Sequence, residues 1–384
     1  MTPTYSESQP PPPRLDPAGP IHLIVPLRPG ADLEQLRARL TSVPALQQRS
    51  VQWHVPGARA DIVHLAARAV DRASQDGGLV VAAGGDGTIN AVAAAAWARG
   101  VPMGVVPLGT FNYFAREQAL SLDPAQAVQD ILQALQAGQM RPVNVGLVNE
   151  RLFLVNASLG LYPRLLDERE RASTRFGRTR LVAIAASIWS ILRGGSARRW
   201  RIALRSDRQA PLQQQEHLAS TLFVGNNPMQ LERVGIAEAR AVADGQHLAA
   251  VLLLPQASEA PARVVWNAVL GRLAQDDAVA SLACTELVAE PAGRRPRRLK
   301  VAFDGEREWM APPIRFRLGE KPLWLVVPGE AAPSSLSSRD KERPWLCSCI
   351  CRTCISAPTI RPCAPPRQDW PHVCPWRCWW SPAT

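Results

Sequence analysis

Two carboxylates stand two residues apart at Asp304 and Glu306, with Gly305 between them. A glycine relaxes the local backbone, so both side chains can point into one cleft. A carboxylate in a cleft can take a proton from a hydroxyl group or hold a metal ion. Asp-Gly is also a favoured dipeptide in tight turns, so this stretch taken alone favours an ordinary hairpin.

A second candidate lies at residues 79–90, where an apolar run of strand length leads into Gly84, Gly85, Asp86, Gly87 and Thr88. The alanine-rich stretch 88–97 predicts a following helix. A strand, a glycine-rich turn and a helix N-terminus together make a phosphate cradle, because unpaired amides and the helix dipole face an anion. Asp86 would repel a phosphate. We expect it to hold a metal ion, a ribose or adenine group, or amides of the loop.

The loop fits neither GxGxxG nor GxxxxGK[ST], so the common dinucleotide and P-loop interpretations do not apply. A second polar loop follows the next apolar run, at residues 107–116. Gly109 and Thr110 can offer an amide and a hydroxyl to a phosphate, and Asn112 can bridge the two loops. The alternative is a polar turn that starts a helix.

The elements that position these loops alternate between strand and helix. Strands are expected at 21–26, 51–55, 79–83 and 103–106, and helices at 32–41, from 61 onward, 88–97 and 124–137. This alternation predicts an α/β fold with a doubly wound parallel sheet. Ligands of such sheets bind at the carboxyl ends of the strands, where both loops fall.

After residue 142 the periodicity changes. Residues 143–148 and 151–155 alternate around Asn149 and Glu150, which predicts a hairpin. Strands are expected at 200–204, 218–224, 247–254, 282–288, 299–303 and 323–327, with helices at 180–193 and 261–273. We therefore expect a disordered lead-in (1–20), a nucleotide-binding domain (21–141) and a mostly antiparallel β-sandwich domain (142–330), with the active-site cleft between the two domains.

These motifs together resemble the diacylglycerol kinase catalytic-domain family, which includes bacterial and sphingosine-kinase-like lipid kinases. The resemblance rests on Gly-Gly-Asp-Gly-Thr at 84–88, Pro-Leu-Gly-Thr-Phe-Asn-Tyr-Phe-Ala-Arg at 107–116 and Asp-Gly-Glu at 304–306. It extends to residues 156–160 and 223–227. Two departures are Tyr113, where the family has Asp, and the first-strand turn 25–28, where the family commonly has Asn-Pro. Arg28 in that turn could meet a phosphate or be a solvated charge.

The resemblance implies an ATP-dependent, Mg²⁺-requiring lipid kinase. It would phosphorylate a hydroxyl of diacylglycerol, a sphingoid base or a related lipid. The nucleotide would bind at Gly84, Gly85, Asp86, Gly87, Thr88, Gly109, Thr110 and Asn112. Asp304 would be the base, and Glu306 would orient it or help to hold the metal; the metal ligands themselves are not identified. Two alternatives stay open: a soluble-substrate kinase of the NAD-kinase type, and a catalytically inactive lipid- or nucleotide-binding regulator.

The charge of the chain points to an anionic partner. The formal net charge is +11, but no aromatic residues interleave with the basic clusters as in nucleic-acid-binding proteins. An anionic membrane surface or an anionic substrate explains the charge as well as DNA would, and we expect no nucleic acid partner. We expect a cytoplasmic protein that associates peripherally with the anionic inner face of the membrane. Arginines at 294, 295, 297 and 298 could serve that contact or be solvated. The apolar stretch 181–192 fits a core helix or a lipid-pocket wall. A homodimer stays open.

Residues 331–384 differ in composition from the rest. Residues 345–384 hold seven of the eight cysteines and no periodic apolar pattern. Cys351 and Cys354 could form half of a zinc site, but no second half follows cleanly. Three interpretations stay open: an out-of-frame or non-native end, a disordered tail, and a metal module. The single earlier cysteine, Cys284, fits a reducing compartment.

Overall fold

In the computed structural model, the described residues are 11–26, 33–55, 62–160, 198–255, 257, 261–293 and 297–329. They lie in one compact unit that spans residues 1–334. The expected helix at 180–193, Arg28, Asp61, Arg294, Arg295 and the tail from residue 330 onward lie outside the described residues. Among the helices that are described, none is both long and apolar enough to cross a membrane.

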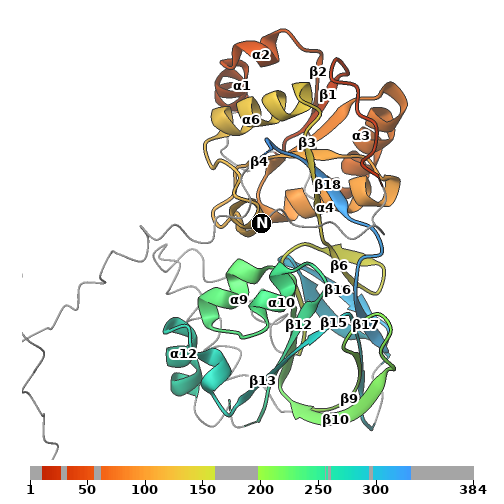
Figure 1. Ribbon diagram of the computed structural model, residues 1–384, viewed down its shortest axis with the longest axis vertical. Helices are drawn as coiled ribbons and strands as arrows, with labels where there is room; N and C mark the ends of the chain where they lie inside the picture. Colours follow the sequence, from red (N-terminus) through yellow and green to blue (C-terminus); the bar gives the residue numbers. More distant parts are fainter. Residues whose placement is uncertain are drawn as a thin grey trace, which may run out of the picture. The chain divides into compact units, whose positions relative to one another are not determined.

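The first domain is built on a six-stranded sheet with the order β2-β1-β3-β4-β18-β5 (Figure 1). Its strands are β1 Ile21–Ile24, β2 Val51–His54, β3 Leu79–Gly84, β4 Met103–Pro107, β5 Met140–Val143 and β18 Leu323–Val326. The first four are parallel: Ile21 lies opposite both Val51 and Leu79, and Val80 lies opposite Met103. Every residue of β3 and β4 is buried, as expected for strands covered on both faces.

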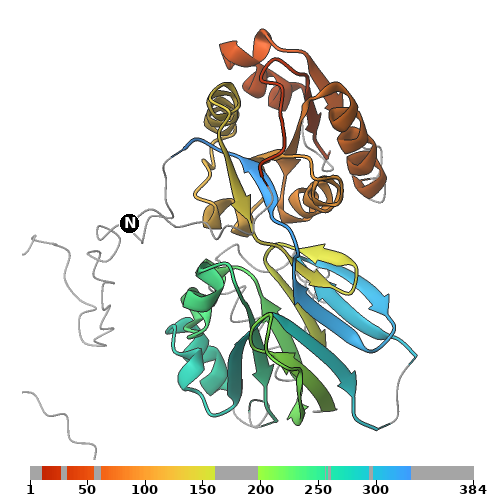
Figure 2. The same cartoon turned by 45° about the vertical axis from the view of Figure 1, so that its right-hand side comes forward.

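Helices cover both faces of this sheet, so the doubly wound α/β fold is confirmed (Figure 2). The helices are α1 Leu33–Thr41, α2 Pro44–Gln47, α3 Ile62–Asp76, α4 Asp86–Arg99, α5 Tyr113–Glu117 and α6 Pro124–Gln136. Residues of α3 and α4 share one core cluster, and residues of α1, α2 and α6 share another. Local signals set the helix ends: Asp123 accepts from two amides at the start of α6, and Gly100 takes a left-handed conformation after α4.

Strand β18 corrects the expected domain layout. We expected residues 323–327 in the β domain, but β18 pairs with β4 in parallel and with β5 in antiparallel orientation. The apolar run predicts a buried strand. It does not predict which strands pair with it, because the chain returns to the first domain after residue 322 and no local sequence pattern indicates this. We propose that the first domain comprises 21–143 and 323–327, and the second domain 144–322.

The second domain is a sandwich of two antiparallel sheets. Their orders are β10-β9-β14-β17-β6-β7 and β13-β12-β11-β8-β15-β16. The strands are β6 Gly146–Val148, β7 Arg151–Phe153, β8 Asn156–Gly160, β9 Arg198–Arg205, β10 Gln213–Ala219, β11 Thr221–Gly225, β12 Leu248–Leu253, β13 Val279–Cys284, β14 Glu286–Pro291, β15 Leu299–Phe303, β16 Glu306–Met310 and β17 Ile314–Leu318. Both sheets contribute to one core cluster, which includes Trp200 and Phe316 from the first sheet and Leu159 and Val301 from the second. The hairpin at Asn149 is confirmed, with Val148 opposite Arg151.

Two of the runs that we expected to be single strands each cover parts of two strands in the structure. The run 218–224 spans the end of β10 and β11, and the run 282–288 spans the end of β13 and β14. In both cases the chain passes from one sheet to the other, at Ser220 and at Thr285. The apolar pattern continues through such a crossing because both strands face the same core. Strands β16 and β17 were not predicted: β16 begins with three consecutive charged residues, and β17 is a short run in which two arginines alternate with apolar residues.

Three helices pack against the second sheet of the sandwich: α9 Pro228–Val234, α10 Ala239–Ala243 and α12 Pro261–Val269, followed by a 3-10 turn at Leu273–Gln275. They share a core cluster with β12, in which Leu231, Ile236, Val264 and Val251 are buried. Figure 1 shows the three helices together on one side of this domain. Only α12 was expected from the sequence.

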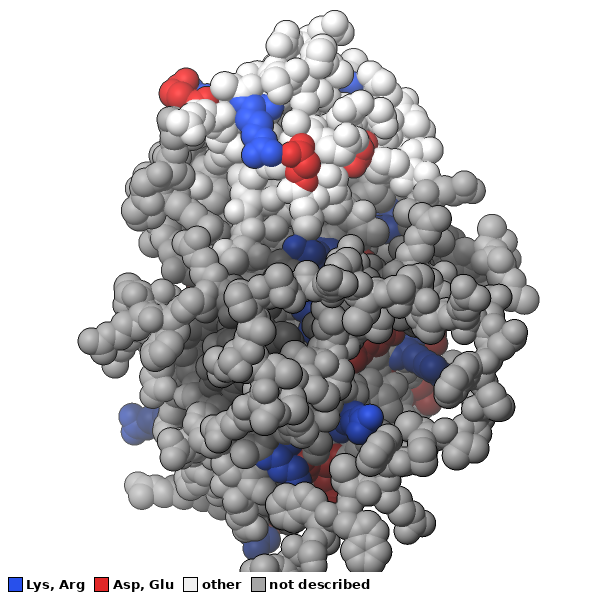
Figure 3. All heavy atoms as spheres, turned by 90° about the vertical axis from the view of Figure 1, so that its left-hand side faces the viewer, with Lys and Arg blue, Asp and Glu red and all other residues white. Residues whose placement is uncertain are grey.

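Part of the expected disordered lead-in is ordered. The amide of Asp16 donates to the carbonyl of Gly77 at 3.3 Å, and Leu15 packs against a core cluster of the first domain. On the face in Figure 3, basic and acidic side chains of the first domain lie scattered among uncharged atoms and do not gather into a patch of one sign.

Candidate active site

The glycine-rich loop joins β3 to α4 as the sequence predicts. Gly85 precedes the helix in an extended conformation, and no side chain caps its first turn. A Cβ on Gly84 would lie 2.6 Å from the Cβ of Thr88, so only glycine fits there. The N-terminus of this 14-residue helix therefore offers backbone amides and a positive dipole end to an anion.

The second loop lies directly against the first. The amide of Leu108 donates to the carbonyl of Gly84 at 2.8 Å. A Cβ on Gly109 would lie 2.8 Å from the Cα of Gly85. The two backbones meet at these glycines, which brings the loops expected to bind nucleotide into one site.

Asp86 connects the loops. Its Oδ1 accepts from the amide of Phe114 at 3.4 Å, and the amides of Tyr113 and Asn112 also act on the carboxylate. Burial raises the pKa of Asp86, and these amides oppose the shift. Of the uses we expected for this side chain, the structure shows that of an acceptor for loop amides, and those amides belong to the neighbouring loop.

Asn112 has an acceptor that the described structure leaves unused. Its backbone is left-handed (φ 50°), and its Nδ2 donates to the carbonyl of Gly109 at 3.0 Å. The Oδ1 is buried with no hydrogen-bond partner among the described residues. A buried acceptor of this kind requires a donor, such as a hydroxyl group. The glycine cradle and this acceptor fit the phosphates and a hydroxyl of a nucleotide such as ATP.

The carboxylates lie in the turn between β15 and β16. Phe303 faces Glu306 across the hairpin, so Asp304 and Gly305 form a two-residue turn. Both have positive φ, 42° and 89°, as a type I′ turn requires. The hairpin interpretation is therefore right for the backbone, and the side chains decide whether the turn has a chemical role.

The carboxylate of Asp304 accepts four hydrogen bonds. Oδ2 accepts from the amide of Leu154 at 2.6 Å and from Nδ2 of Asn90 at 2.8 Å. Oδ1 accepts from the amides of Val155 at 2.9 Å and Asn156 at 3.0 Å. Because each carboxylate oxygen has two lone pairs, all four are occupied. The turn is fixed to the segment between β7 and β8.

Burial raises the pKa of Asp304 to about 6, although the four hydrogen bonds oppose the shift. A carboxylate that titrates near neutral pH is suited to proton transfer, because it is ionised at working pH and still basic enough to take a proton.

Asn90 is a site residue that the sequence analysis missed. It lies on α4, is buried, and donates from Nδ2 to the carbonyl of Leu152 at 3.0 Å as well as to Asp304. One helix thus begins at the phosphate cradle and holds the carboxylate one turn later. A signal existed, since Asn90 is the one polar residue in the stretch 89–96 of this helix, which is otherwise Ile, Ala and Val.

Glu306 lies next to the glycine loop. A Cβ on Gly87 would be 3.5 Å from its Oε1. The side chain of Glu306 is exposed. Among the described residues no group of three His, Cys, Asp or Glu side chains could hold a metal ion. Mg²⁺ in nucleotide sites commonly uses one or two carboxylates and the phosphates, so Glu306 with the bound nucleotide fits that ion.

The motifs at 156–160 and 223–227 support the site from behind. Asn226 donates to the carbonyls of Asn144 and Leu154, both at 3.1 Å. Asn227 caps α9 by accepting from the amide of Gln230 at 2.8 Å, and Gln230 in turn accepts from Asn156 at 3.0 Å. These side chains hold the strand ends and α9 in place around Asp304.

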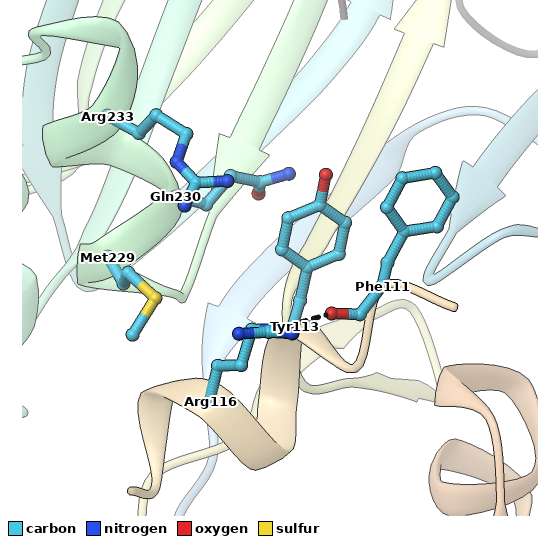
Figure 4. Close-up of a pocket in the computed structure, with 6 residues that line it drawn as sticks. All are labelled: Phe111, Tyr113, Arg116, Met229, Gln230 and Arg233. Carbon is cyan, nitrogen blue, oxygen red and sulfur yellow. Dashed lines mark hydrogen bonds between the residues drawn. The ribbon is translucent and has the colours of Figure 1, made fainter. Parts of the chain in front are cut away.

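A small, open pocket adjoins the second loop (Figure 4). The rings of Phe111 and Tyr113 stack with centroids 5.6 Å apart, and Nε of Arg116 donates to the carbonyl of Phe111 at 3.0 Å. The lining from α9 is Met229, Gln230 and Arg233. Tyr113, the departure from the family pattern, therefore presents an aromatic ring to this pocket.

Comparison with known proteins finds similarity to the same family that the motifs resemble. Residues 24–148 match the model of the diacylglycerol kinase catalytic domain. A probable lipid kinase YegS-like from Serratia proteamaculans (strain 568) is 40% identical over 100 residues, which are 25% of this chain and 32% of that protein. The one from Klebsiella pneumoniae (strain 342) is 35% identical over 136 residues, 34% of this chain and 42% of that protein. The matched segments thus span less than half of either relative.

The fold has a counterpart among solved structures. A crystal structure described as a diacylglycerol kinase from Bacillus anthracis str. Sterne superposes with a TM-score of 0.57 at 16% sequence identity, and the match covers 81% of this chain and 98% of that one. At this identity the likeness shows a common fold and nothing finer.

Proposed function

We propose that the protein is an ATP-dependent lipid kinase, because residues 24–148 match the model of the diacylglycerol kinase catalytic domain. It transfers the γ-phosphate of ATP to a hydroxyl of diacylglycerol, a sphingoid base or a related lipid. The observation that carries the proposal is that the glycine-rich loop and its helix α4 contact the turn that holds Asp304 and Glu306. Asn90 on the cradle helix lies 2.8 Å from Asp304, and Gly87 in the loop faces Glu306.

The cradle residues bind and orient the nucleotide. Gly84, Gly85, Gly87 and Thr88 present the N-terminus of α4 to the phosphates, and Gly109 and Thr110 extend this surface. Asp86 keeps the second loop in register through the amide of Phe114. The unused Oδ1 of Asn112 accepts from a nucleotide hydroxyl. Mg²⁺ supplies positive charge that offsets the charge on the transferred phosphate.

Asp304 takes the proton of the lipid hydroxyl. The hydroxyl oxygen then bonds to the γ-phosphorus of ATP, and the bond between this phosphorus and ADP breaks. A proton on Oδ2 displaces one of the two donors at that oxygen. The amide of Leu154 is fixed in the backbone, whereas the side chain of Asn90 can turn away and keep its bond to Leu152. Asn90 is therefore a positioning residue that holds the ionised base and releases it on protonation. Glu306 orients this base or helps to hold Mg²⁺.

One observation favours a second function. The four donors around Asp304 would also suit a purely structural carboxylate in a regulator that binds nucleotide or lipid without turnover. The raised pKa of Asp304 favours the kinase, because a structural carboxylate gains nothing from titrating near pH 6.

The deciding experiment is an assay with radiolabelled ATP over a panel of lipids, with NAD as a soluble acceptor. A labelled lipid that the wild-type protein makes, and that Asp304→Asn does not make, supports the proposal. Label in NAD alone would favour a soluble-substrate kinase. ATP binding with no turnover on any acceptor would favour the regulator.

The proposed partners follow from the substrate. A lipid acceptor lies in a bilayer, so we propose a peripheral association with the inner face of the cytoplasmic membrane.

A further inference from the structure

We propose that the outer face of α12 inserts into a phospholipid bilayer and thereby places the pocket beside α9 at the membrane. This face consists of Trp266 and Leu270, with Arg263 and Arg272 at its ends. The proposal names the docking surface of the enzyme, and its link to catalysis rests on the proposed lipid kinase function.

The apolar exposure of this face is not explained by folding. Trp266 is 63% exposed and Leu270 47% exposed, and Trp266 is the most exposed large apolar side chain among the described residues. The amide of Leu270 donates to the carbonyl of Trp266 at 3.0 Å, so the two side chains lie one helical turn apart on the same side. The opposite side of the helix packs into the core, where Val264 and Ala268 are buried.

The area of this face favours a bilayer over a protein partner. A tryptophan side chain offers at most about 250 Å², so the exposed parts of Trp266 and Leu270 together offer roughly that much. A stable protein interface buries about 800 Å² on each partner. Two apolar anchors are too few for such an interface, but they are sufficient for reversible insertion into the headgroup region, where tryptophan is favoured.

Charge decides how the face binds. Arg263 donates to Asp276 at 3.0 Å, and this carboxylate is buried, so the charge of Arg263 is compensated. Arg272 and Arg233 are exposed, and so are the acids Asp277 and Glu232. Because these charges balance, apolar insertion must supply most of the affinity. The exposed arginines can still contact lipid phosphates while their stems cover apolar surface.

The face is continuous with the pocket at the candidate site. Helices α9 and α12 touch through their ends: the amide of Ala274 donates to the carbonyl of Gly235 at 3.2 Å, and a Cβ on Gly271 would lie 3.5 Å from the carbonyl oxygen of Arg233. Arg233 also lines the pocket beside Tyr113 (Figure 4). Arg233 therefore contacts the chain that follows α12 through its backbone and also lines the pocket beside the second loop.

The test is sedimentation of the full chain with phosphatidylcholine vesicles at about 0.1 M and about 1 M salt. The wild-type protein should bind at both. Trp266→Ser with Leu270→Ser should bind at least about tenfold more weakly, because two partly buried apolar groups are lost. The matched control is Trp309→Ser, which removes a tryptophan that is 58% exposed on β16, and it should bind like wild type.

Three results would overturn the proposal: equal binding by the double variant, no binding by the wild-type chain, or a change in oligomeric state of the double variant in vesicle-free solution. A separate assay uses a water-soluble short-chain diacylglycerol, on which the double variant should keep wild-type turnover. If the wild-type protein phosphorylates no lipid but still binds vesicles through Trp266 and Leu270, the kinase proposal fails and the docking surface stands.

Discussion

At the scale of single residues, Asp304 combines two requirements that usually conflict. Four donors hold its carboxylate in one orientation, which favours the ionised form, and burial disfavours that form. The balance leaves the pKa at about 6, within reach of both protonation states at neutral pH. The role of base that we propose for Asp304 requires a carboxylate that is oriented as well as basic, and the four donors supply the orientation.

Replacing Asp304 by Asn tests this role. Asn-Gly suits a type I′ turn at least as well as Asp-Gly, so the hairpin should form unchanged. We expect kcat to fall about 10²–10⁴-fold with ATP affinity nearly unchanged, since only the proton acceptor is lost. The matched control is Glu306→Gln. A kcat above about a tenth of wild type would reject Asp304 as the base, and a larger loss in Glu306→Gln would move the assignment to Glu306.

Asn90 gives a prediction that depends on pH. Wild-type kcat/KM should rise with pH through about 6 and level off above it, because the base must be ionised. Asn90→Ala removes a donor to Oδ2 and should move this rise to higher pH with a smaller effect on the plateau. Asn90→Asp adds a negative charge at the same place and should move it further. Identical pH profiles in all three proteins would contradict a positioning role.

Asp86 gives a prediction about the loops. Asp86→Ala leaves the amides at the start of α5 without their acceptor, which costs about 1–3 kcal/mol of stability and frees the second loop. We expect ATP binding to be lost while the protein remains folded. Calorimetry measures the affinity and circular dichroism the fold. An unchanged ATP affinity would show that the link between the loops is not needed for the nucleotide site.

At the scale of elements, local signals predicted those whose causes are local. Strand β3 and helix α4 follow from an apolar run, glycines and an alanine-rich stretch, and the loops at 84–88 and 107–116 were placed correctly at strand ends. The domain expected for β18 was wrong, because β18 pairs with β4 and β5. The expected strands 218–224 and 282–288 were wrong as well, since each passes from one sheet to the other, and strand pairing depends on distant parts of the chain. The role of Asn90 was missed for the same reason: its partner is 214 residues away.

A cluster between β1, β2 and α3 gives a prediction of stability against pH. Nδ1 of His22 lies 3.2 Å from Nε2 of His54, and Nε2 of His22 lies 3.0 Å from Asp76. Burial lowers the pKa of His54, helped by His22, Arg72 and Arg68. The folded state therefore favours neutral His54. The stability that this difference gives the folded state is fully present above pH 6.5, the usual pKa of histidine, and is lost as the pH falls from 6.5 toward the lower pKa that His54 has in the folded state.

Replacing His54 by Gln should remove this part of the pH dependence. The free energy of unfolding, measured by denaturant titration, should fall less between neutral and mildly acidic pH in His54→Gln than in wild type. The matched control is His64→Gln on the exposed side of α3, which should follow the wild-type curve. Parallel curves for wild type and His54→Gln would contradict the assignment.

At the scale of the whole molecule, the described core closes before residue 330. Strand β18 completes the first sheet between β4 and β5, and its apolar residues join the core clusters of that domain. The described residues lie in one compact unit. The chain beyond it has no periodic apolar pattern with which to dock, and it holds seven of the eight cysteines.

Deletion of residues 334–384 should therefore leave both turnover and stability intact. The melting temperature should change by less than ~2 °C, the size expected when no packed side chain is lost. ATP turnover should match the full chain, because the candidate residues lie between 84 and 306. Mass spectrometry of the full chain tests whether these residues form a metal module. If the full chain holds stoichiometric zinc, and both the zinc and the turnover are lost on deletion, the fold depends on such a module and the prediction is wrong.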